Sequence, residues 1–143
     1  MDDCIKTPLI LNPAEGTFSV FAWIKGGGPG QVILSQAGGA NWLVADNAAG
    51  ALMTQLKESG RKSRDLASPK VVTDGQWHRV GLIWDGANRV LVMDGAEVAR
   101  DTQVGLVGLT GGLYLGAGPT LGPGSFWTGL IDDVYLYNRA VKP

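Results

Sequence analysis

The chain has 143 residues, a formal net charge of −1 and a composition that is 45% hydrophobic and 17% charged. This length suits one domain with its own core, and the composition is too apolar for a disordered chain. The near-neutral charge gives no reason to expect nucleic-acid binding, which usually shows as a strongly basic domain. No segment approaches the ~20 consecutive apolar residues of a membrane-spanning helix.

The start of the chain, Met1-Asp2-Asp3, is acidic and has no apolar stretch behind it, so it is not a signal peptide. The single cysteine, Cys4, cannot form an internal disulfide. A lone cysteine is compatible both with the cytoplasm and with a secreted protein that uses no disulfides. The compartment therefore stays open, and any export signal of a parent protein would lie outside this sequence.

The 22 glycines and 7 prolines divide the chain into short runs rich in β-branched and aromatic residues. Such runs, with no amphipathic helix between them, predict an all-β sandwich or barrel. Nine strands are predicted, at Thr17–Lys25, Gln31–Gln36, Asn41–Asp46, Ala51–Lys57, His78–Asp85, Arg89–Asp94, Glu97–Asp101, Gly112–Gly116 and Gly129–Tyr137. No repeat or linker divides the chain, which predicts a single domain over residues 1–143.

Residues 78–101 are predicted to form a three-stranded antiparallel meander. Period-two alternation in its first strand places three apolar residues on one face: Val80, Leu82 and Trp84. Asp-Gly pairs at 85–86 and 94–95 separate the strands, and this pair is a strong signal of a hairpin turn.

Three blocks of sequence resemble the laminin-G-like, concanavalin A-like family of jelly-roll domains. They are residues 18–25 (FSVFAWIK), the meander from DGQWHRV at 74–80 to MDG at 93–95, and residues 126–140 (FWTGLIDDVYLYNRA). The blocks occur in the family's order and cover nearly the whole chain. The resemblance implies an antiparallel, two-sheet jelly-roll β-sandwich of the concanavalin A-like type.

The chain departs from the family pattern at its start. Residues 3–8 (DCIKTP) resemble a strand before which family members usually carry another strand, and that usual first strand is lacking here. A missing strand would leave the backbone groups of its partner unpaired, as a template for another chain. We therefore expect a homodimer formed through the sheet edge.

The five tryptophans are divided between the core and a candidate binding site. Trp23, Trp77 and Trp127 match framework positions of the family, and Trp84 shares a face with Val80, so these four are expected in the core. Trp42 follows a glycine-containing turn at a strand start, which leaves two alternatives open. Its ring either packs in the core or is exposed, where its flat face would stack on a sugar.

The sequence lacks the common catalytic patterns except for a Ser-x-x-Lys match at 59–62, which lies in a polar stretch without the helix that this motif requires. The paired carboxylates of glycoside hydrolases have no match, because the three glutamates, Glu15, Glu58 and Glu97, are scattered. Asp132 and Asp133 are adjacent on a strand, so their side chains point to opposite faces. The single histidine, His78, precedes a core strand, which favours a structural role. We therefore expect no enzyme activity.

The resemblance to the family also implies a structural calcium site near the first and last strands. Calcium requires several oxygen ligands, often from different segments. Asp3 matches the acid of the early strand and Asp132 matches the closing Asp-Asp pair, so these two residues are the candidate metal ligands. Hydrogen-bonding roles for both acids are the alternative.

Five of the twelve basic residues lie between positions 57 and 70, which we call the basic segment: Lys57, Arg61, Lys62, Arg64 and Lys70. Such a cluster is suited to a sulfated or carboxylated glycan, which it would hold by charge-assisted hydrogen bonds. The alternative is a solvated loop without a ligand. The candidate ligand-binding residues are Trp42, Lys57, Arg61, Lys62 and Arg64.

The sequence thus predicts a non-catalytic binding module that recognises a glycan or a protein surface. Two alternatives from other classes remain. One is a structural or adhesive domain that associates with another chain through its open sheet edge. The other is a hydrolase or lyase of the same fold, against which the missing carboxylate motif argues.

Overall fold

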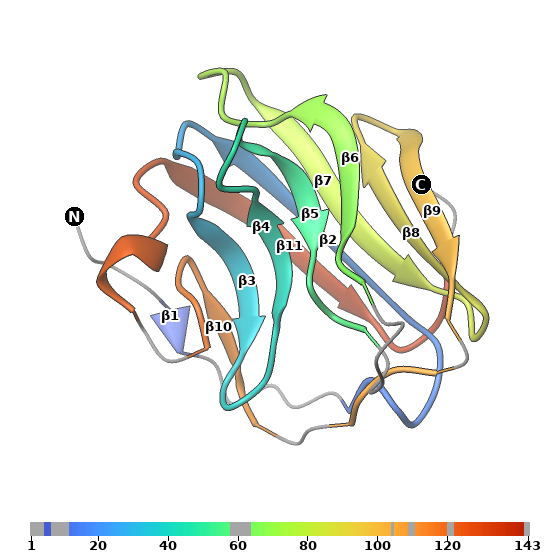
Figure 1. The fold of residues 1–143 in the computed structure, drawn as a ribbon. Helices are drawn as coiled ribbons and strands as arrows, with labels where there is room; N and C mark the ends of the chain where they lie inside the picture. The colour runs from blue at the N-terminus through green and yellow to red at the C-terminus, as the bar shows by residue number, and fades with distance from the viewer. Residues whose placement is uncertain are drawn as a thin grey trace.

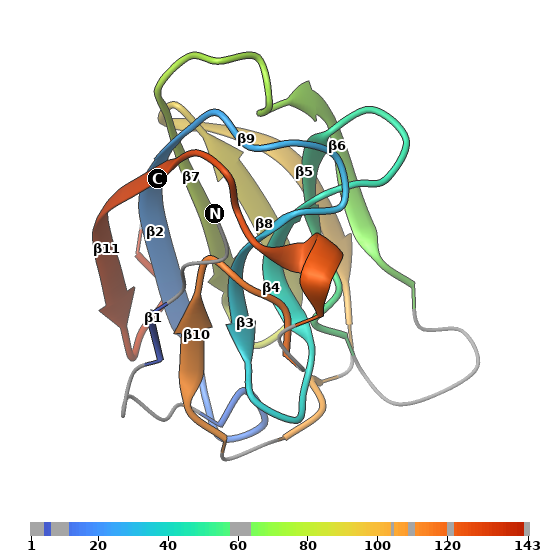
Figure 2. The same ribbon diagram turned by 90° about the vertical axis from the view of Figure 1, so that its left-hand side faces the viewer.

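The computed structural model describes residues 5–6, 12–57, 64–103, 105–108, 111–119 and 122–141. Two antiparallel sheets pack face to face (Figures 1 and 2), with the orders β1-β10-β3-β4-β5-β6 and β11-β2-β7-β8-β9. The expected all-β jelly-roll sandwich is confirmed. The strands are β1 (Ile5–Lys6), β2 (Phe18–Lys25), β3 (Val32–Gln36), β4 (Asn41–Ala45), β5 (Ala51–Thr54), β6 (Leu66–Val71), β7 (His78–Trp84), β8 (Asn88–Met93), β9 (Ala96–Thr102), β10 (Leu113–Leu115) and β11 (Leu130–Tyr137).

One short 3₁₀ helix, η1 (Pro123–Ser125), connects β10 to β11. Among the residues that the structure describes, no helix is long and apolar enough to cross a membrane.

Strand β2 lies inside the five-stranded sheet, between β11 and β7, and carries apolar residues on both of its faces. Four alternate side chains point between the sheets and are buried in the main core: Phe18, Val20, Ala22 and Ile24. The intervening residues, Ser19, Phe21, Trp23 and Lys25, belong to the outer face, since successive strand residues point to opposite sides. Strand β2, which is buried on one face and partly covered on the other, thus pairs with both of its neighbours in the middle of this sheet.

The predicted meander is confirmed as β7, β8 and β9, paired in sequence order. Its inner face carries Val80, Leu82 and Trp84 in the core, as expected from the alternation. The β8–β9 turn consists of Asp94 (φ 54°) and Gly95 (φ 84°), both in the left-handed region. Two such residues form the type I′ turn that matches the twist of a hairpin.

Strand β6 is missing from the sequence prediction because Pro69 lies within it. Proline removes a backbone donor and is tolerated mainly on edge strands, and β6 is the outermost strand of the six-stranded sheet. At the other edge, β1 pairs with β10 in the segment that the family resemblance marked as a strand. The predicted association through a sheet edge stays a prediction.

The tryptophans that match framework positions divide between core and surface. Trp84 and Trp127 are buried, as expected. The prediction is wrong for Trp23 and Trp77, which are 37% and 43% exposed. Trp23 lies on the outer face of β2, where the ladder pairs it with Arg79 and Asp132, so its ring faces solvent rather than the other sheet.

A second, smaller core lies on the outer face of the five-stranded sheet. Phe21, Ile83, Val90 and Val92 are buried there, with Tyr137 and Val141 packed against them. The chain after β11 is held across this face because Ser19 Oγ donates to the carbonyl of Arg139 (2.8 Å) and accepts the N–H of Val141 (2.9 Å). One end of the outer face is therefore covered by the chain's own C-terminal segment.

We expect Gly81→Ala to lower the free energy of unfolding by about 1–3 kcal/mol, the usual cost of overpacking. A Cβ at Gly81 would lie 2.4 Å from the Phe21 ring and 2.8 Å from the Val20 carbonyl oxygen. Urea unfolding of the variant measures this loss. Gly16→Ala is the matched control, because a Cβ there meets no atom within 4 Å, and equal losses in both variants would contradict the packing argument.

Candidate functional site

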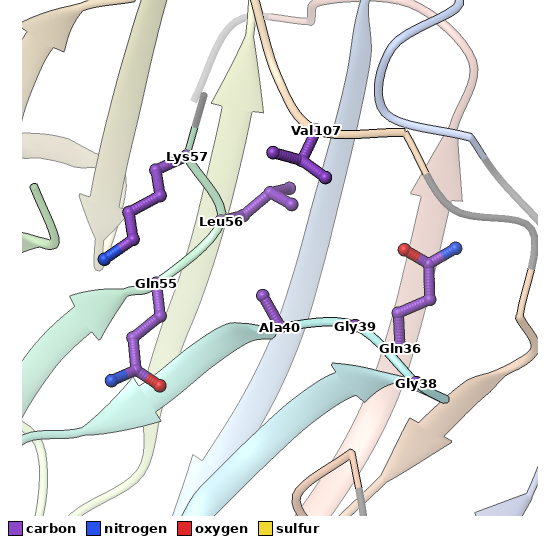
Figure 3. A pocket seen from close by; sticks show the side chains of 8 residues that line it. All are labelled: Gln36, Gly38, Gly39, Ala40, Gln55, Leu56, Lys57 and Val107. Atoms are coloured by element: carbon purple, nitrogen blue, oxygen red, sulfur yellow. The ribbon is translucent and has the colours of Figure 1, made fainter. Parts of the chain in front are cut away.

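A pocket of about 300 Å³ opens where the β3–β4 hairpin meets the chain that follows β5 (Figure 3). We call it the hairpin pocket. One wall comes from the hairpin, a second from the segment after β5, and a third from the connection between β9 and β10. Its lining residues are Gln36, Gly38, Gly39, Ala40, Gln55, Leu56, Lys57 and Val107.

The middle of the hairpin pocket is apolar, with polar groups at its borders. Figure 3 shows Leu56 and Val107 beside each other on one side of the space, with Ala40 opposite. The Val107 N–H donates to the carbonyl of Lys57 (3.1 Å), which ties these two walls together. The Gln36 side chain borders the space and is itself fixed, since its Nε2 donates to the Gly111 carbonyl (3.1 Å). This mixture of apolar wall and few polar groups is typical of small-ligand sites.

A chain of polar contacts joins the hairpin pocket to the basic segment. Asn41 Nδ2 donates to Gln55 Oε1 (2.6 Å), and Gln55 Nε2 donates to Asp65 Oδ2 (3.3 Å). Lys57 Nζ contacts the other Asp65 oxygen at 3.0 Å, and both partners of this ion pair are more than a third exposed. Because exposed ion pairs contribute at most about 1 kcal/mol, the Lys57 ammonium exchanges this partner at little cost.

The buried side chain of Arg89 fixes the chain on both sides of residues 58–63. Arg89 projects from β8 and is 0% exposed. Its guanidinium pairs with Asp101 through Nε (2.8 Å) and Nη2, and it also donates to the carbonyls of Leu56 (3.0 Å) and Arg64 (2.7 Å). The two carbonyls lie on either side of residues 58–63. One guanidinium therefore holds the chain before and after these residues against the five-stranded sheet.

The structure brings some of the predicted basic ligands together and leaves others undescribed. Lys57 lines the hairpin pocket, and Arg64 is exposed at the other end of the clamped segment. Arg61 and Lys62 lie outside the described residues. Lys70 is exposed on the edge strand β6. The role of these residues as glycan ligands stays a prediction.

Trp42 has the core position that the sequence left open as an alternative. It is 0% exposed, and its ring lies 5.0 Å from the Phe18 ring, centroid to centroid, at an interplanar angle of 34°. Its Nε1 is buried without a hydrogen-bond partner among the described residues. The alternative of an exposed ring, and with it the assignment of Trp42 as a candidate glycan ligand, is wrong, because this side chain points between the two sheets and has no free face for a sugar.

The two predicted metal ligands do not form a site within the described residues. Asp3 lies outside them, and Asp132 is exposed on β11, where its Oδ1 accepts the backbone N–H of Asp133 (2.8 Å). The described part of the chain contains no group of three or more His, Cys, Asp or Glu residues that would hold a metal ion. Calcium binding therefore stays a prediction that depends on Asp3 and on further ligands.

His78 bridges two turns. The sequence predicted a structural role for this residue but not its two partners. Its Nδ1 lies 2.7 Å from Asp94 Oδ2, and its Nε2 lies 2.8 Å from Asp74 Oδ1. Burial alone lowers the pKa of His78, but the hydrogen bonds and charges of Asp94 and Asp74 outweigh it, and the net pKa is raised. The pKa of Asp74 is in turn lowered, first by the N–H of Gln76 and then by His78.

Sequence reasoning identified Lys57 but missed the other walls of the hairpin pocket. Gln36 and Gln55 are polar residues at strand ends, and Val107 lies in a connection without a motif. Glutamine at the end of an apolar strand is a weak signal, since most such residues only face solvent. What places these three side chains together is the pairing of β3 and β4, the clamp at Arg89 and the path of the β9–β10 connection.

Two packed antiparallel sheets in this order define a jelly-roll β-sandwich of the concanavalin A-like type. A family model described as the concanavalin A-like lectin/glucanases superfamily matches residues 2–143. The chain belongs to this family of laminin-G-like domains, and the resemblance noted in the sequence is confirmed. No curated protein sequence is significantly similar to the chain.

Among solved structures, the carbohydrate-binding module CBM40 of the Ruminococcus gnavus IT-sialidase is similar over nearly its whole length. The TM-score is 0.67 at 15% identity, with 98% of this chain and 92% of that chain covered. The binding domain of the Paraclostridial Mosquitocidal Protein 1 has a TM-score of 0.67 at 12% identity over 92% of this chain, which spans only 36% of that one. Domains LG4-5 of the mouse laminin alpha1 chain have a TM-score of 0.60 at 18% identity, with 92% and 39% covered. At these identities the similarity shows the fold alone.

We expect Arg89→Met to lower the free energy of unfolding by about 3 kcal/mol, because removing one partner of a buried ion pair costs about 3–5 kcal/mol and Asp101 is partly exposed. The double variant Arg89→Met/Asp101→Leu leaves no unpaired carboxylate and is expected to regain part of this loss. Urea unfolding measures both. If the double variant is no more stable than the single one, the pairing with Asp101 does not determine the loss.

The His78 cluster predicts that part of the stability depends on pH. Because the folded-state pKa of His78 is raised, its contribution is complete below the unfolded pKa of about 6.5 and is lost as the pH rises through the folded pKa. Urea midpoints between pH 5.5 and pH 9 are expected to fall across this window and to fall less in His78→Gln. The same slope in both proteins would assign the effect to another group.

Proposed function

We propose that this domain is a non-catalytic module that binds a carboxylated or sulfated oligosaccharide at the hairpin pocket. The observation that carries the proposal is that Lys57 both borders the pocket and begins the basic segment. A sugar ring would lie against the apolar wall of Leu56 and Val107. Its anionic group would contact Lys57 and the neighbouring basic residues Arg61, Lys62 and Arg64.

The volume and composition of the hairpin pocket support a small sugar unit. A space of about 300 Å³ is at the lower end of the range for ligand sites and leaves room for one or two rings. The Gln55 amide uses one acceptor site on Asn41 and one N–H on Asp65, and its second N–H and second lone pair match sugar hydroxyl groups. Because Arg89 already holds the carbonyls of Leu56 and Arg64, the chain at these two positions would lose less conformational entropy on binding.

Structures of the same fold support a glycan as the class of ligand. One solved form of the Ruminococcus gnavus IT-sialidase CBM40 is bound to alpha2,3 sialyllactose. Domain 4 of an arabinanase from Geobacillus stearothermophilus is in complex with arabinotriose. A botulinum neurotoxin DC binding domain is in complex with SialylT. The first of these ligands carries a carboxylate, which is the kind of group that the basic segment favours.

A glycan array also distinguishes this proposal from the alternative of a protein-interaction module. A glycan array that includes sialylated, uronic-acid and sulfated oligosaccharides tests the class of ligand directly. No retained glycan on the array would overturn the proposal and favour the structural alternative. Release of reducing sugar from a polysaccharide would instead favour a hydrolase or lyase.

We expect Lys57→Gln to weaken binding of an anionic array ligand by about tenfold or more, because a charge-assisted hydrogen bond contributes about 1.5–3 kcal/mol. Asp65→Asn is expected to strengthen binding by up to about fivefold, since it frees Lys57 from a competing ion pair of at most about 1 kcal/mol. Isothermal titration calorimetry at two salt concentrations measures both changes.

Lys25→Gln is the matched control, since it removes one positive charge from the outer face of the other sheet. It is expected to leave the affinity nearly unchanged at physiological salt, where charges farther apart than about 8 Å are screened. Equal losses in Lys57→Gln and Lys25→Gln would mean that only the net charge matters, and the hairpin pocket would then not be the site.

A further inference from the structure

Exposed apolar side chains gather at one end of the outer face of the five-stranded sheet. Six large hydrophobic side chains are exposed among the described residues, and four of them belong to this region. Leu130, Trp23 and Tyr135 are on the outer face of β11 and β2, and Trp77 directly precedes β7. We call these four residues the aromatic patch. The other two, Val71 and Val107, lie elsewhere.

The strand register explains why these residues share one surface. Leu130 pairs with Lys25 and Tyr135 with Phe21, while Trp23 lies between Asp132 and Arg79. Residues directly opposite in a ladder share a face, as do residues two apart along a strand. Trp77 lies two residues before Arg79, which places it at the end of the same face. The bulge in β11 at Asp133 (φ 46°) preserves the alternation on both sides of it.

Within the described residues, the C-terminal segment covers the opposite end of this face and leaves the aromatic patch open. The segment held by Ser19 packs Val141 and Tyr137 over the outer core. Tyr137 stacks with Tyr135 at 6.4 Å between centroids and an interplanar angle of 16°. Tyr135 itself is 51% exposed and Trp23 is 37% exposed. The patch therefore begins where the covered outer core ends, and the Tyr135 ring contacts the Tyr137 ring of that core.

The chemistry of the aromatic patch distinguishes it from a simple apolar surface. Three of its four members are aromatic residues with a polar tip, the indole N–H or the phenol O–H. Charged groups flank the rings with both signs: Asp132 on one side of Trp23, and Arg79 on the other, where its guanidinium lies 4.2 Å from the Phe21 ring centroid. Lys25 adjoins Leu130. A polyanion would meet the exposed carboxylate of Asp132 beside Trp23, so neither a nucleic acid nor a sulfated glycan is favoured.

A neutral pyranose chain fits this combination of groups. The C–H face of a sugar ring is apolar and stacks on an aromatic face, while its hydroxyl groups project from the rim of the ring. At the aromatic patch those hydroxyls would meet a carboxylate acceptor in Asp132 and cationic donors in Arg79 and Lys25. An exposed sheet face, unlike an enclosed pocket, suits an extended chain rather than a single sugar.

We propose that the aromatic patch is a second glycan-binding surface, which binds an extended neutral polysaccharide by ring stacking on Trp23, Tyr135 and Trp77. This surface lies on the five-stranded sheet and shares no residue with the hairpin pocket. The two surfaces are expected to bind ligands of different charge. The aromatic patch carries charges of both signs and suits a neutral ligand, whereas Lys57 and the basic segment favour an anion. The two proposals therefore succeed or fail separately.

The test is affinity gel electrophoresis of the intact chain in gels that contain hydroxyethyl cellulose, glucomannan or laminarin. Retardation by at least one of these neutral polymers is expected. Tyr135→Ala and Trp23→Ala are each expected to weaken binding about tenfold, which corresponds to about 1.4 kcal/mol for one lost stacking contact. Tryptophan fluorescence of the wild type is expected to shift on addition of the same polymer, and less so in Trp23→Ala.

Two controls separate this surface from general effects. Val71→Ala removes an exposed apolar side chain on the other sheet and is expected to leave the retardation unchanged. Lys57→Gln is expected to leave it unchanged as well, while Tyr135→Ala leaves binding of anionic glycans intact. Unfolding midpoints of all variants are compared with the wild type, and Tyr135→Ala, which alters the most exposed of the three rings, stands in if Trp23→Ala fails to fold.

Three outcomes would overturn the proposal. The first is that none of the three polymers retards the wild-type chain. The second is that Tyr135→Ala and folded Trp23→Ala are retarded as strongly as Val71→Ala. The third is a wild-type dimer in analytical ultracentrifugation that Tyr135→Ala converts to a monomer, because the aromatic patch would then be an interface between two copies of the chain.

Discussion

The buried guanidinium of Arg89 links the two sheets at the end of the sandwich where the hairpin pocket lies. It belongs to the five-stranded sheet through β8 and pairs with Asp101 on the neighbouring strand β9. It reaches the other sheet through the carbonyls of Leu56 and Arg64. A buried charge is costly unless it is paired and hydrogen-bonded, so the position of the segment between these carbonyls is set by the needs of one side chain.

This interaction connects stability to the proposed binding site. After β5, the N–H of Gln55 still donates to the Asn41 carbonyl on β4 (3.0 Å). The carbonyls of Leu56 and Lys57 are instead held by Arg89 and by the Val107 N–H. Binding residues are often carried on loops that a rigid scaffold positions, and here a core residue performs the positioning. A substitution at Arg89 is therefore expected to affect both folding and the pocket, whereas one at Lys57 acts on the pocket alone.

Much of the fold was predictable from local patterns, because the period of two and the glycine-rich turns are recorded in neighbouring residues. The meander and the inward face of Val80, Leu82 and Trp84 follow from alternation alone. The family resemblance added the two-sheet arrangement. Strand β6 was not predictable in this way, since Pro69 argues against a strand unless its position at the sheet edge is known.

The candidate site was less predictable, because its residues come together only through long-range packing. The side chains of Trp23 and Trp42 illustrate the difference. Both lie on strands, but the ring of Trp42 points between the sheets and the ring of Trp23 points outward. Alternation shows that two neighbouring residues differ in face, and only the packing of one sheet on the other decides which face is the core. Gln36, Gln55 and Val107 carry no local signal of the pocket that they share.

The two surfaces proposed for glycan binding differ most clearly in the charges of their side chains. Near the hairpin pocket the acid Asp65 is shared between Lys57 and Gln55, and the basic residues outnumber it. At the aromatic patch Asp132 offsets part of the positive charge of Arg79 and Lys25, and the ring faces supply the contact area. Because Coulombic interactions with exposed groups weaken with salt and ring stacking does not, the two surfaces are expected to respond differently to ionic strength. One small sandwich would then recognise two chemically distinct parts of a polysaccharide, with each sheet contributing one surface.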